Sequence, residues 1–164
     1  MVTIEGASYE STHLVAGGFN CSLRFVSVCL RDNSADSIGT LDRARAGDLV
    51  VGVSEHQPWT EVSDQGEYSG SEVELIKGFA ESIDADVEWY SAPESVLAGK
   101  IKEDQLDIVI GGLTSTSPWS THMALTRPYT KVDGESMVMG TRLGENELMV
   151  ALERYLAEEF GEIS

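Results

Sequence analysis

The fold is decided by an apolar run that ends in two glycines, LDIVIGG at residues 106–112. A second short run of this kind, LVVGV, stands at residues 49–53 between Gly47 and Ser54. Short continuous apolar runs are typical of strands that are buried on both faces, as in the parallel sheets of α/β proteins. We therefore expect residues 49–53 and 106–110 to be core strands of one sheet.

Helical periodicity follows the first of these runs. Between residues 70 and 83, apolar side chains recur at three- and four-residue spacings, which predicts an amphipathic helix. The charged residues Glu72, Lys77 and Glu81 are expected to face away from its apolar side.

The remaining elements give a βαβαβ order, which is typical of α/β proteins. They are a strand at 87–90, a short helix over 93–101, a strand at 137–139 and a last helix with its apolar face between 148 and 160. The predicted fold class is α/β, a single three-layer lobe with a mostly parallel sheet.

The composition indicates one acidic globular domain. The chain has 164 residues, 41% of them hydrophobic, and its 28 Asp and Glu against 11 Lys and Arg give a formal net charge of -17. A surface this acidic repels phosphate backbones and anionic lipids, which argues against nucleic-acid binding and electrostatic membrane adhesion. Two interpretations of the charge stay open: a well-solvated surface, or adaptation to high salt, where screening weakens self-repulsion.

Residues 1–40 are expected to form a weakly ordered leader, and residues 41–164 the domain proper. The leader is rich in Ser, Gly, Asn and Asp, and it holds both cysteines, Cys21 and Cys29. Two thiols with only His13 nearby do not make a four-ligand zinc site, so no metal is expected. The first residues lack the basic start and the uninterrupted apolar stretch of a secretory signal, so no signal peptide is predicted.

The candidate binding residues follow two of the predicted strands. The first strand is followed by SEHQPW at residues 54–59, and the second run by GGLTSTSPW at residues 111–119. Ligands of open parallel sheets bind at the carboxyl ends of the strands. Aromatic rings, hydroxyls and backbone carbonyls that meet at one sheet edge are features of a small-molecule pocket.

Four motifs carry a family resemblance: VGV at 51–53 with the Pro58-Trp59 pair, GSEVEL at 70–75, LDIVIGGLT at 106–114 and TRPY at 126–129. In order and spacing they resemble the first lobe of family 3 periplasmic solute-binding proteins, the amino-acid receptors of ABC importers. The resemblance implies a type II periplasmic-binding fold, in which two α/β lobes close on a polar solute by hinge motion. It also implies an extracytoplasmic location and an ABC transporter permease as partner.

The resemblance implies ligand-binding roles for residues of the two loops. Trp59 would be an aromatic wall beside the solute, Gly112 would offer a carbonyl to an ammonium group, and Thr114 would add a hydroxyl and a backbone N–H. Thr116 corresponds to a second threonine of the family. Trp119 stands where the family has its carboxylate-clamping Arg, and we assign it as a second wall, because an indole cannot supply two charge-assisted hydrogen bonds.

A second departure from the family follows the TRPY motif. Family members continue into an entire second lobe, whereas here only residues 130–143 separate Tyr129 from the segment that resembles the return to a terminal helix. We therefore expect a single lobe. One lobe cannot enclose a solute, so we expect low affinity unless another chain, such as a homodimer mate, covers the loops.

The main hypothesis is a non-enzymatic module that binds a small polar solute such as an amino acid, without a cofactor. The alternative is a degenerate lobe that acts as a dimerisation or protein-interaction domain and binds no solute. A third function is an enzyme on this scaffold, such as a dehydratase of prephenate-like acids. An enzyme would need a buried acid with a shifted pKa and a basic anchor for carboxylates, and the sequence offers no such set, so no catalytic residue is assigned.

Several of these residues also have a structural interpretation. Trp59 and Trp119 fit caps of the core at strand ends as well as ligand contacts. His56 beside Glu55 is typical of a solvated loop pair, and Glu72 near a helix start is favoured by the helix macrodipole whatever the function.

Overall fold

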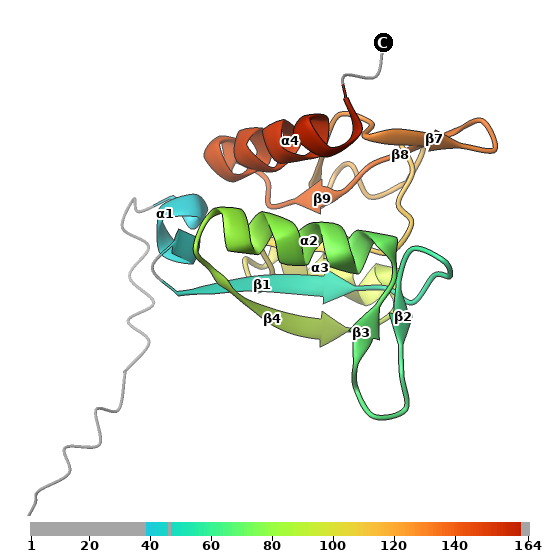
Figure 1. Ribbon diagram of the computed structural model, residues 1–164, viewed down its shortest axis with the longest axis horizontal. Coiled ribbons are helices and arrows are strands. Elements are labelled where there is room, and N and C mark those ends of the chain that lie inside the picture. Colours follow the sequence, from blue (N-terminus) through green and yellow to red (C-terminus); the bar gives the residue numbers. More distant parts are fainter. Residues whose placement is uncertain (1–38, 46, 162–164) are drawn as a thin grey trace, which may run out of the picture. The chain divides into compact units, whose positions relative to one another are not determined.

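The two core strands are neighbours in a five-stranded sheet (Figure 1). The computed structural model describes residues 39–45 and 47–161. In spatial order the strands are β4 (Asp86–Ser91), β1 (Asp48–Val53), β5 (Ile108–Ile110), β9 (Gly140–Thr141) and β6 (Ala124–Leu125). β1 is parallel to β4 and β5, whereas β9 runs antiparallel to β5 and β6. The predicted mostly parallel sheet is confirmed.

Helices cover both faces of this sheet (Figure 1). They are α1 (Thr40–Arg45), α2 (Ser71–Ser82), α3 (Glu94–Lys102) and α4 (Asn146–Phe160). One apolar cluster joins side chains of α1, α2 and α4 to Ile108 and Ile110, and a second joins side chains of α3 to Val109. Successive side chains of a strand point to opposite faces, so α3 covers one face and the other three helices cover the other. The three-layer α/β lobe is confirmed.

Two short hairpins stand outside the main sheet. They are β2 (Glu61–Val62) with β3 (Tyr68–Ser69), and β7 (Thr130–Val132) with β8 (Glu135–Met137). The strand predicted at 137–139 is therefore wrong in its bounds, because Met137 ends β8 and the chain rejoins the main sheet at β9. Residues 137–139 are all buried, so this apolar run marks the core without forming a strand over its length.

The other predicted elements are present with their bounds shifted by one or two residues. The helix α1 is an addition that the sequence did not indicate. Of the expected leader, only residues 39 and 40 are described, and both cysteines lie outside the described residues. None of the helices within residues 39–45 and 47–161 is long and apolar enough to cross a membrane.

A buried carboxylate ties the start of β5 to three other segments. Asp107 accepts hydrogen bonds from the guanidinium groups of Arg43 and Arg142, and its Oδ2 accepts one from the Val50 N–H at 2.9 Å. The side chain of Asp107 is 1% exposed and that of Arg142 is 16% exposed. Asp107 thereby joins α1, β1 and the segment after β9. It does so at the end of β5 opposite to the loop that begins at Gly111.

Candidate functional site

The loops after β1 and β5, residues 54–60 and 111–119, lie against each other. His56 Nδ1 is 3.2 Å from the carbonyl oxygen of Gly111. A Cβ atom built on Gly112 would lie 2.6 Å from Cδ1 of Trp59, so the indole lies directly against the Gly112 backbone. The structure therefore brings together Trp59 and Gly112, two residues that the sequence assigns to one site.

Thr60 closes the first of these loops. Its side chain is fully buried, and its hydroxyl donates to the Ser54 carbonyl and accepts from the His56 N–H at 3.0 Å. The Trp59 N–H donates to the His56 carbonyl at 2.9 Å. These bonds satisfy much of the loop's backbone internally. They hold Trp59 half-buried, with its ring packed partly against the main core cluster.

A buried carboxylate supports the second loop from the protein interior. Glu72, in the first turn of α2, is 0% exposed. Its Oε2 accepts hydrogen bonds from the N–H groups of Gly111 and Gly112 at 2.8 and 3.0 Å, and its Oε1 accepts one from the Tyr129 hydroxyl at 2.6 Å. Both glycines have positive φ, 144° and 68°, which glycine adopts at little steric cost. Glu72 thereby sets the orientation of the Gly111–Gly112 backbone.

The expectation that Glu72 faces away from the apolar side of its helix is wrong. Glu72 precedes Ile76 by four residues and Phe79 by seven, and these three side chains share the buried face of α2. The helical spacing contains this signal, since a carboxylate on an apolar stripe must find a buried partner. Tyr129 of the TRPY motif is one such partner. An interaction of Glu72 with the helix macrodipole does not require its side chain to be buried, so that interpretation does not predict the buried orientation of Glu72.

Burial raises the pKa of Glu72, and this effect outweighs the opposing influence of its hydrogen bonds from Tyr129, Gly112 and Gly111 and of His56 nearby. Burial, followed by the charge of Glu72, also raises the pKa of the Tyr129 hydroxyl. Tyr129 therefore remains a hydrogen-bond donor to Glu72 throughout the neutral pH range.

The raised pKa gives a pH-dependent stability with a defined sign. The folded protein binds the Glu72 proton more tightly than the unfolded chain does. As the pH falls through the raised pKa toward the ordinary value of 4.5, the wild type should gain free energy of unfolding relative to Glu72→Gln, which cannot titrate there. Urea unfolding of both proteins at about pH 8, 7, 6 and 5 measures this difference. A difference that shrinks toward low pH would mean that the hydrogen bonds outweigh burial.

The threonines of the second loop follow the glycines. Oγ1 of Thr114 lies 2.9 Å from Oγ1 of Thr116, and the Thr114 N–H donates to Ser117 Oγ at 3.4 Å. The Ser115 N–H donates to the Ser136 carbonyl of β8 at 2.9 Å, which ties this segment to the β7–β8 hairpin. Thr116 is exposed and Thr114 is half-buried. The two hydroxyls therefore form one polar pair near the surface.

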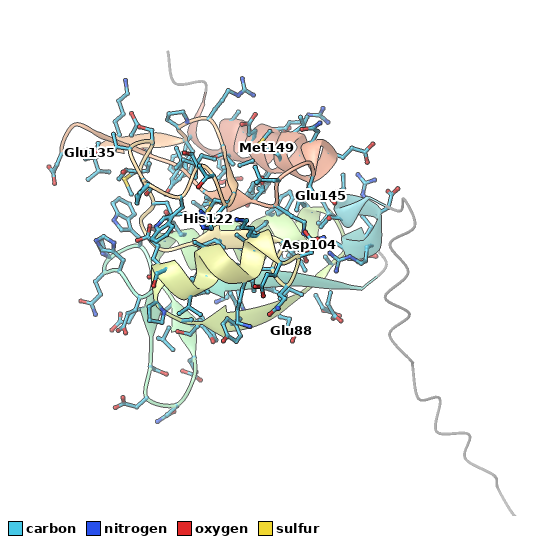
Figure 2. The ribbon with its side chains drawn as sticks, turned by 180° about the vertical axis from the view of Figure 1, so that it is seen from behind. Glu88, Asp104, His122, Glu135, Glu145 and Met149 are labelled. Atoms are coloured by element: carbon cyan, nitrogen blue, oxygen red, sulfur yellow. The ribbon has the colours of Figure 1, made fainter. Side chains whose placement is uncertain are left out.

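Trp119 is positioned by a different part of the core. Its ring packs partly against the cluster on the α3 side and meets His122 edge-on, with the ring centroids 5.7 Å apart (Figure 2, where His122 is labelled). The structure thus groups Trp59 with Gly112 and His56, pairs Thr114 with Thr116, and joins Trp119 to His122. A core cap and a ligand contact both remain interpretations of Trp119.

The two loops carry no Lys or Arg. Arg127, the nearest arginine in sequence, is held elsewhere, because its backbone N–H and its Nε bond the Glu153 carboxylate at 2.7 and 2.9 Å. Among residues 39–45 and 47–161, no cluster of three His, Cys, Asp or Glu could hold a metal ion. The exposed and half-buried side chains of the two loops are therefore indole rings, hydroxyls and the side chains of residues such as Glu55 and His56.

Gly112→Ala should displace the Trp59 ring. The new Cβ would lie 2.6 Å from Trp59 Cδ1 and 2.9 Å from His56 Nδ1, so these side chains must move. Gly134→Ala is a matched control, because Gly134 also has positive φ, 88°, but a Cβ there meets nothing within 4 Å. Both variants should lose about 1 kcal/mol of stability through backbone strain. Gly112→Ala alone should also change the tryptophan emission of the folded protein, and identical spectra for the two variants would contradict the contact.

The two loops and the residues that support them lie within a stretch of sequence that matches a known protein family. The family of bacterial extracellular solute-binding proteins, family 3, matches residues 49–158, a range that holds both loops, Glu72 and Tyr129. The chain belongs to this family. The resemblance that the sequence motifs indicate is therefore confirmed.

One curated relative is the arginine-binding periplasmic protein of Mannheimia haemolytica. It is 25% identical over 91 residues, which cover 56% of this chain and 38% of that protein. The chain thus spans well under half of the length of this relative.

Solved structures with the same fold include single domains. The arginine-bound form of domain 1 of TmArgBP, in a point mutant, matches with a TM-score of 0.67 at 23% identity, over 73% of this chain and 97% of that one. An ancestral cationic amino acid solute-binding protein has a TM-score of 0.64 at 14% identity, covering 73% and 93%. At these identities the likeness shows the fold alone.

One structural neighbour is named as an enzyme. An ancestral cyclohexadienyl dehydratase is 26% identical with a TM-score of 0.51, over 56% of this chain and 39% of that one. The family that matches the chain is nevertheless described as solute-binding proteins, so the chain resembles binding proteins rather than enzymes.

Proposed function

We propose that this chain is an extracytoplasmic binding module for a small amino-acid-like solute of the arginine type, and that it serves an ABC-type import system. The observation that carries the proposal is the contact between the two strand-end loops, in which Trp59 lies against Gly112. Membership of the solute-binding family and the arginine-binding relative support this choice of solute.

In this proposal the solute binds across the two loops without covalent chemistry. Within the described residues no hydrogen bond reaches the Gly112 carbonyl, which leaves it available to an ammonium or guanidinium group. Thr114 and Thr116 offer hydroxyls, and Trp59 offers a flat face to a cation or an apolar stem. Trp119 is proposed as a second wall. Glu72 keeps the loop in place and does not itself touch the solute.

A single lobe is proposed to be sufficient for binding. Domain 1 of TmArgBP has been crystallised in an arginine-bound form, and this chain matches 97% of that domain. A transporter permease as partner, and a second copy covering the loops, are parts of the same proposal.

Trp59→Ala should weaken arginine binding by about five- to thirtyfold, since the loss of an indole that contacts a cation costs roughly 1 to 2 kcal/mol. A thermal-shift titration measures this, because a ligand that binds only the folded state raises the melting temperature as its concentration increases. Thr116→Ala should reduce the shift, whereas Ser95→Ala, which removes an exposed hydroxyl of α3 outside the two loops, should leave it unchanged.

Light scattering in the same experiment reports the oligomeric state. The proposal predicts a saturable shift that requires Trp59 and Thr116. A stable dimer with no shift for arginine or other amino acids would favour the interaction-domain hypothesis instead.

A further inference from the structure

The backbone of the glycine loop cannot serve as a site for an anion. Successive N–H groups in a loop with positive φ can form a concave nest that binds carboxylates or phosphates. Here the N–H groups of Gly111 and Gly112 both donate to the buried Glu72 carboxylate. The Glu72 carboxyl group already fills the position that a bound anion would need.

Basic side chains are also absent from the two loops. The only charged residues that they contain are Glu55 and the titratable His56. The guanidinium groups of Arg43 and Arg142 bind Asp107 at the opposite end of β5, and Arg127 binds Glu153.

Lys131 is a basic residue of the β7–β8 hairpin, and this hairpin pairs with the second loop. It stands on β7 opposite Ser136 of β8, while Thr114 bridges to Met137 of β8. The β8 strand thus separates the backbone of Lys131 from the threonine pair. Lys131 is exposed, and its contribution is tested directly below.

What remains at the sheet edge are groups that attract cations. They are the unengaged Gly112 carbonyl, the Thr114–Thr116 hydroxyl pair and the face of the Trp59 indole. The formal net charge of -17 adds a long-range attraction for cations at low ionic strength. The hydroxyls can donate as well as accept, but the loops offer no guanidinium or ammonium group, so a ligand carboxylate finds no charge-assisted pair there, whereas a ligand cation meets a carbonyl oxygen and an indole face.

We infer that the site selects an organic cation through its ammonium or guanidinium group and makes no use of a ligand carboxylate. This inference rests on the proposed function and narrows it: the solute class is the alkylamine or alkylguanidine, with or without an amino-acid headgroup. An arginine molecule would bind through its cationic groups, with its carboxylate directed to solvent.

The test compares arginine with two probes that each lack one of its groups. Agmatine lacks the carboxylate, and 5-guanidinopentanoate lacks the α-amine. Calorimetric titration of the full chain at fixed ionic strength measures their dissociation constants. Agmatine should bind at least as tightly as arginine, and 5-guanidinopentanoate, which keeps one cationic group, should bind more weakly than agmatine, which keeps two. Arginine binding about tenfold or more tighter than agmatine would overturn the inference while leaving the proposed function intact.

Lys131→Ala provides the control for a remote carboxylate contact. The inference predicts that this variant changes arginine and agmatine binding by the same small factor, less than about twofold, through its effect on net charge. A loss confined to arginine would locate a carboxylate contact at Lys131 and contradict the inference. If none of the three probes binds to the wild type at millimolar concentration, the proposed function fails together with the inference.

Discussion

Glu72→Leu should lower the free energy of unfolding by about 3 to 5 kcal/mol. The substitution leaves three buried donors without an acceptor, the N–H groups of Gly111 and Gly112 and the Tyr129 hydroxyl. Each unsatisfied buried donor costs about 1 to 3 kcal/mol, and removal of the buried carboxylate offsets part of the sum. Urea unfolding monitored by circular dichroism measures the change.

Glu72→Gln is the matched variant for this prediction. Its amide oxygen can still accept from both glycine N–H groups, and its NH₂ group can donate to the Tyr129 oxygen. It should therefore retain most of the stability that the leucine variant loses. Equal losses in the two variants would contradict the role of Glu72 as the acceptor that orients the loop. The leucine variant, where folded, should also lose the arginine-dependent thermal shift, because the Gly112 carbonyl is no longer held.

Asp107→Asn should have an effect of similar size, about 3 to 5 kcal/mol, at the other end of β5. The variant removes the charge that faces Arg43 and Arg142, and leaves the guanidinium of Arg142, which is 16% exposed, without its buried counter-ion. Removing one partner of a buried ion pair is costly because the remaining charge stays desolvated. Chemical unfolding at constant ionic strength measures the loss.

Asp104→Asn is the control for Asp107→Asn. Asp104 lies 3.4 Å from Nε of the same arginine, but its side chain is 71% exposed. An ion pair whose carboxylate is this exposed contributes at most about 1 kcal/mol, so this variant should be nearly as stable as the wild type. Two variants with equal, small losses would show that the Asp107 network does not hold α1 and the segment after β9 to the sheet. Ligand binding should be unaffected in either variant as long as it folds, because Asp107 lies before β5 and the second binding loop lies after β5.

The sequence predicts the layers of this fold because its apolar runs and helical stripes are local signals. The short apolar runs at 49–53 and 106–110 predict buried strands and the 70–83 stripe predicts an amphipathic helix, and all three are found with small shifts of their ends. The strand predicted at 137–139 is wrong in its bounds because an apolar run indicates that residues are buried but not which strands they pair with. Its residues are buried, but the strand partners are decided by the β7–β8 turn and by the return to β9.

The candidate site is predicted only in part, for a physical reason. Its loops can be located because they follow the core strands, and the contact between Trp59 and Gly112 agrees with that location. The role of Glu72 is missed because the groups that donate to its carboxylate come from segments 39, 40 and 57 residues away, and no local pattern reports such partners. The same limit applies to Asp107, whose charge is matched by arginines at 64 and 35 residues' distance in sequence.

A cationic solute that binds at the carboxyl ends of β1 and β5 should perturb the residues of the two loops. The most direct measurement is an NMR titration of the ¹⁵N-labelled chain with arginine, which resolves the indole N–H of each of its three tryptophans. Trp89 is an internal control, because it stacks on Tyr68 with ring centroids 5.3 Å apart and belongs to neither loop. We expect saturable shifts of the Trp59 indole and of the Gly112 and Thr114 amides, with the Trp89 indole unchanged. Saturable shifts confined to other residues, or none at millimolar arginine, would contradict this expectation.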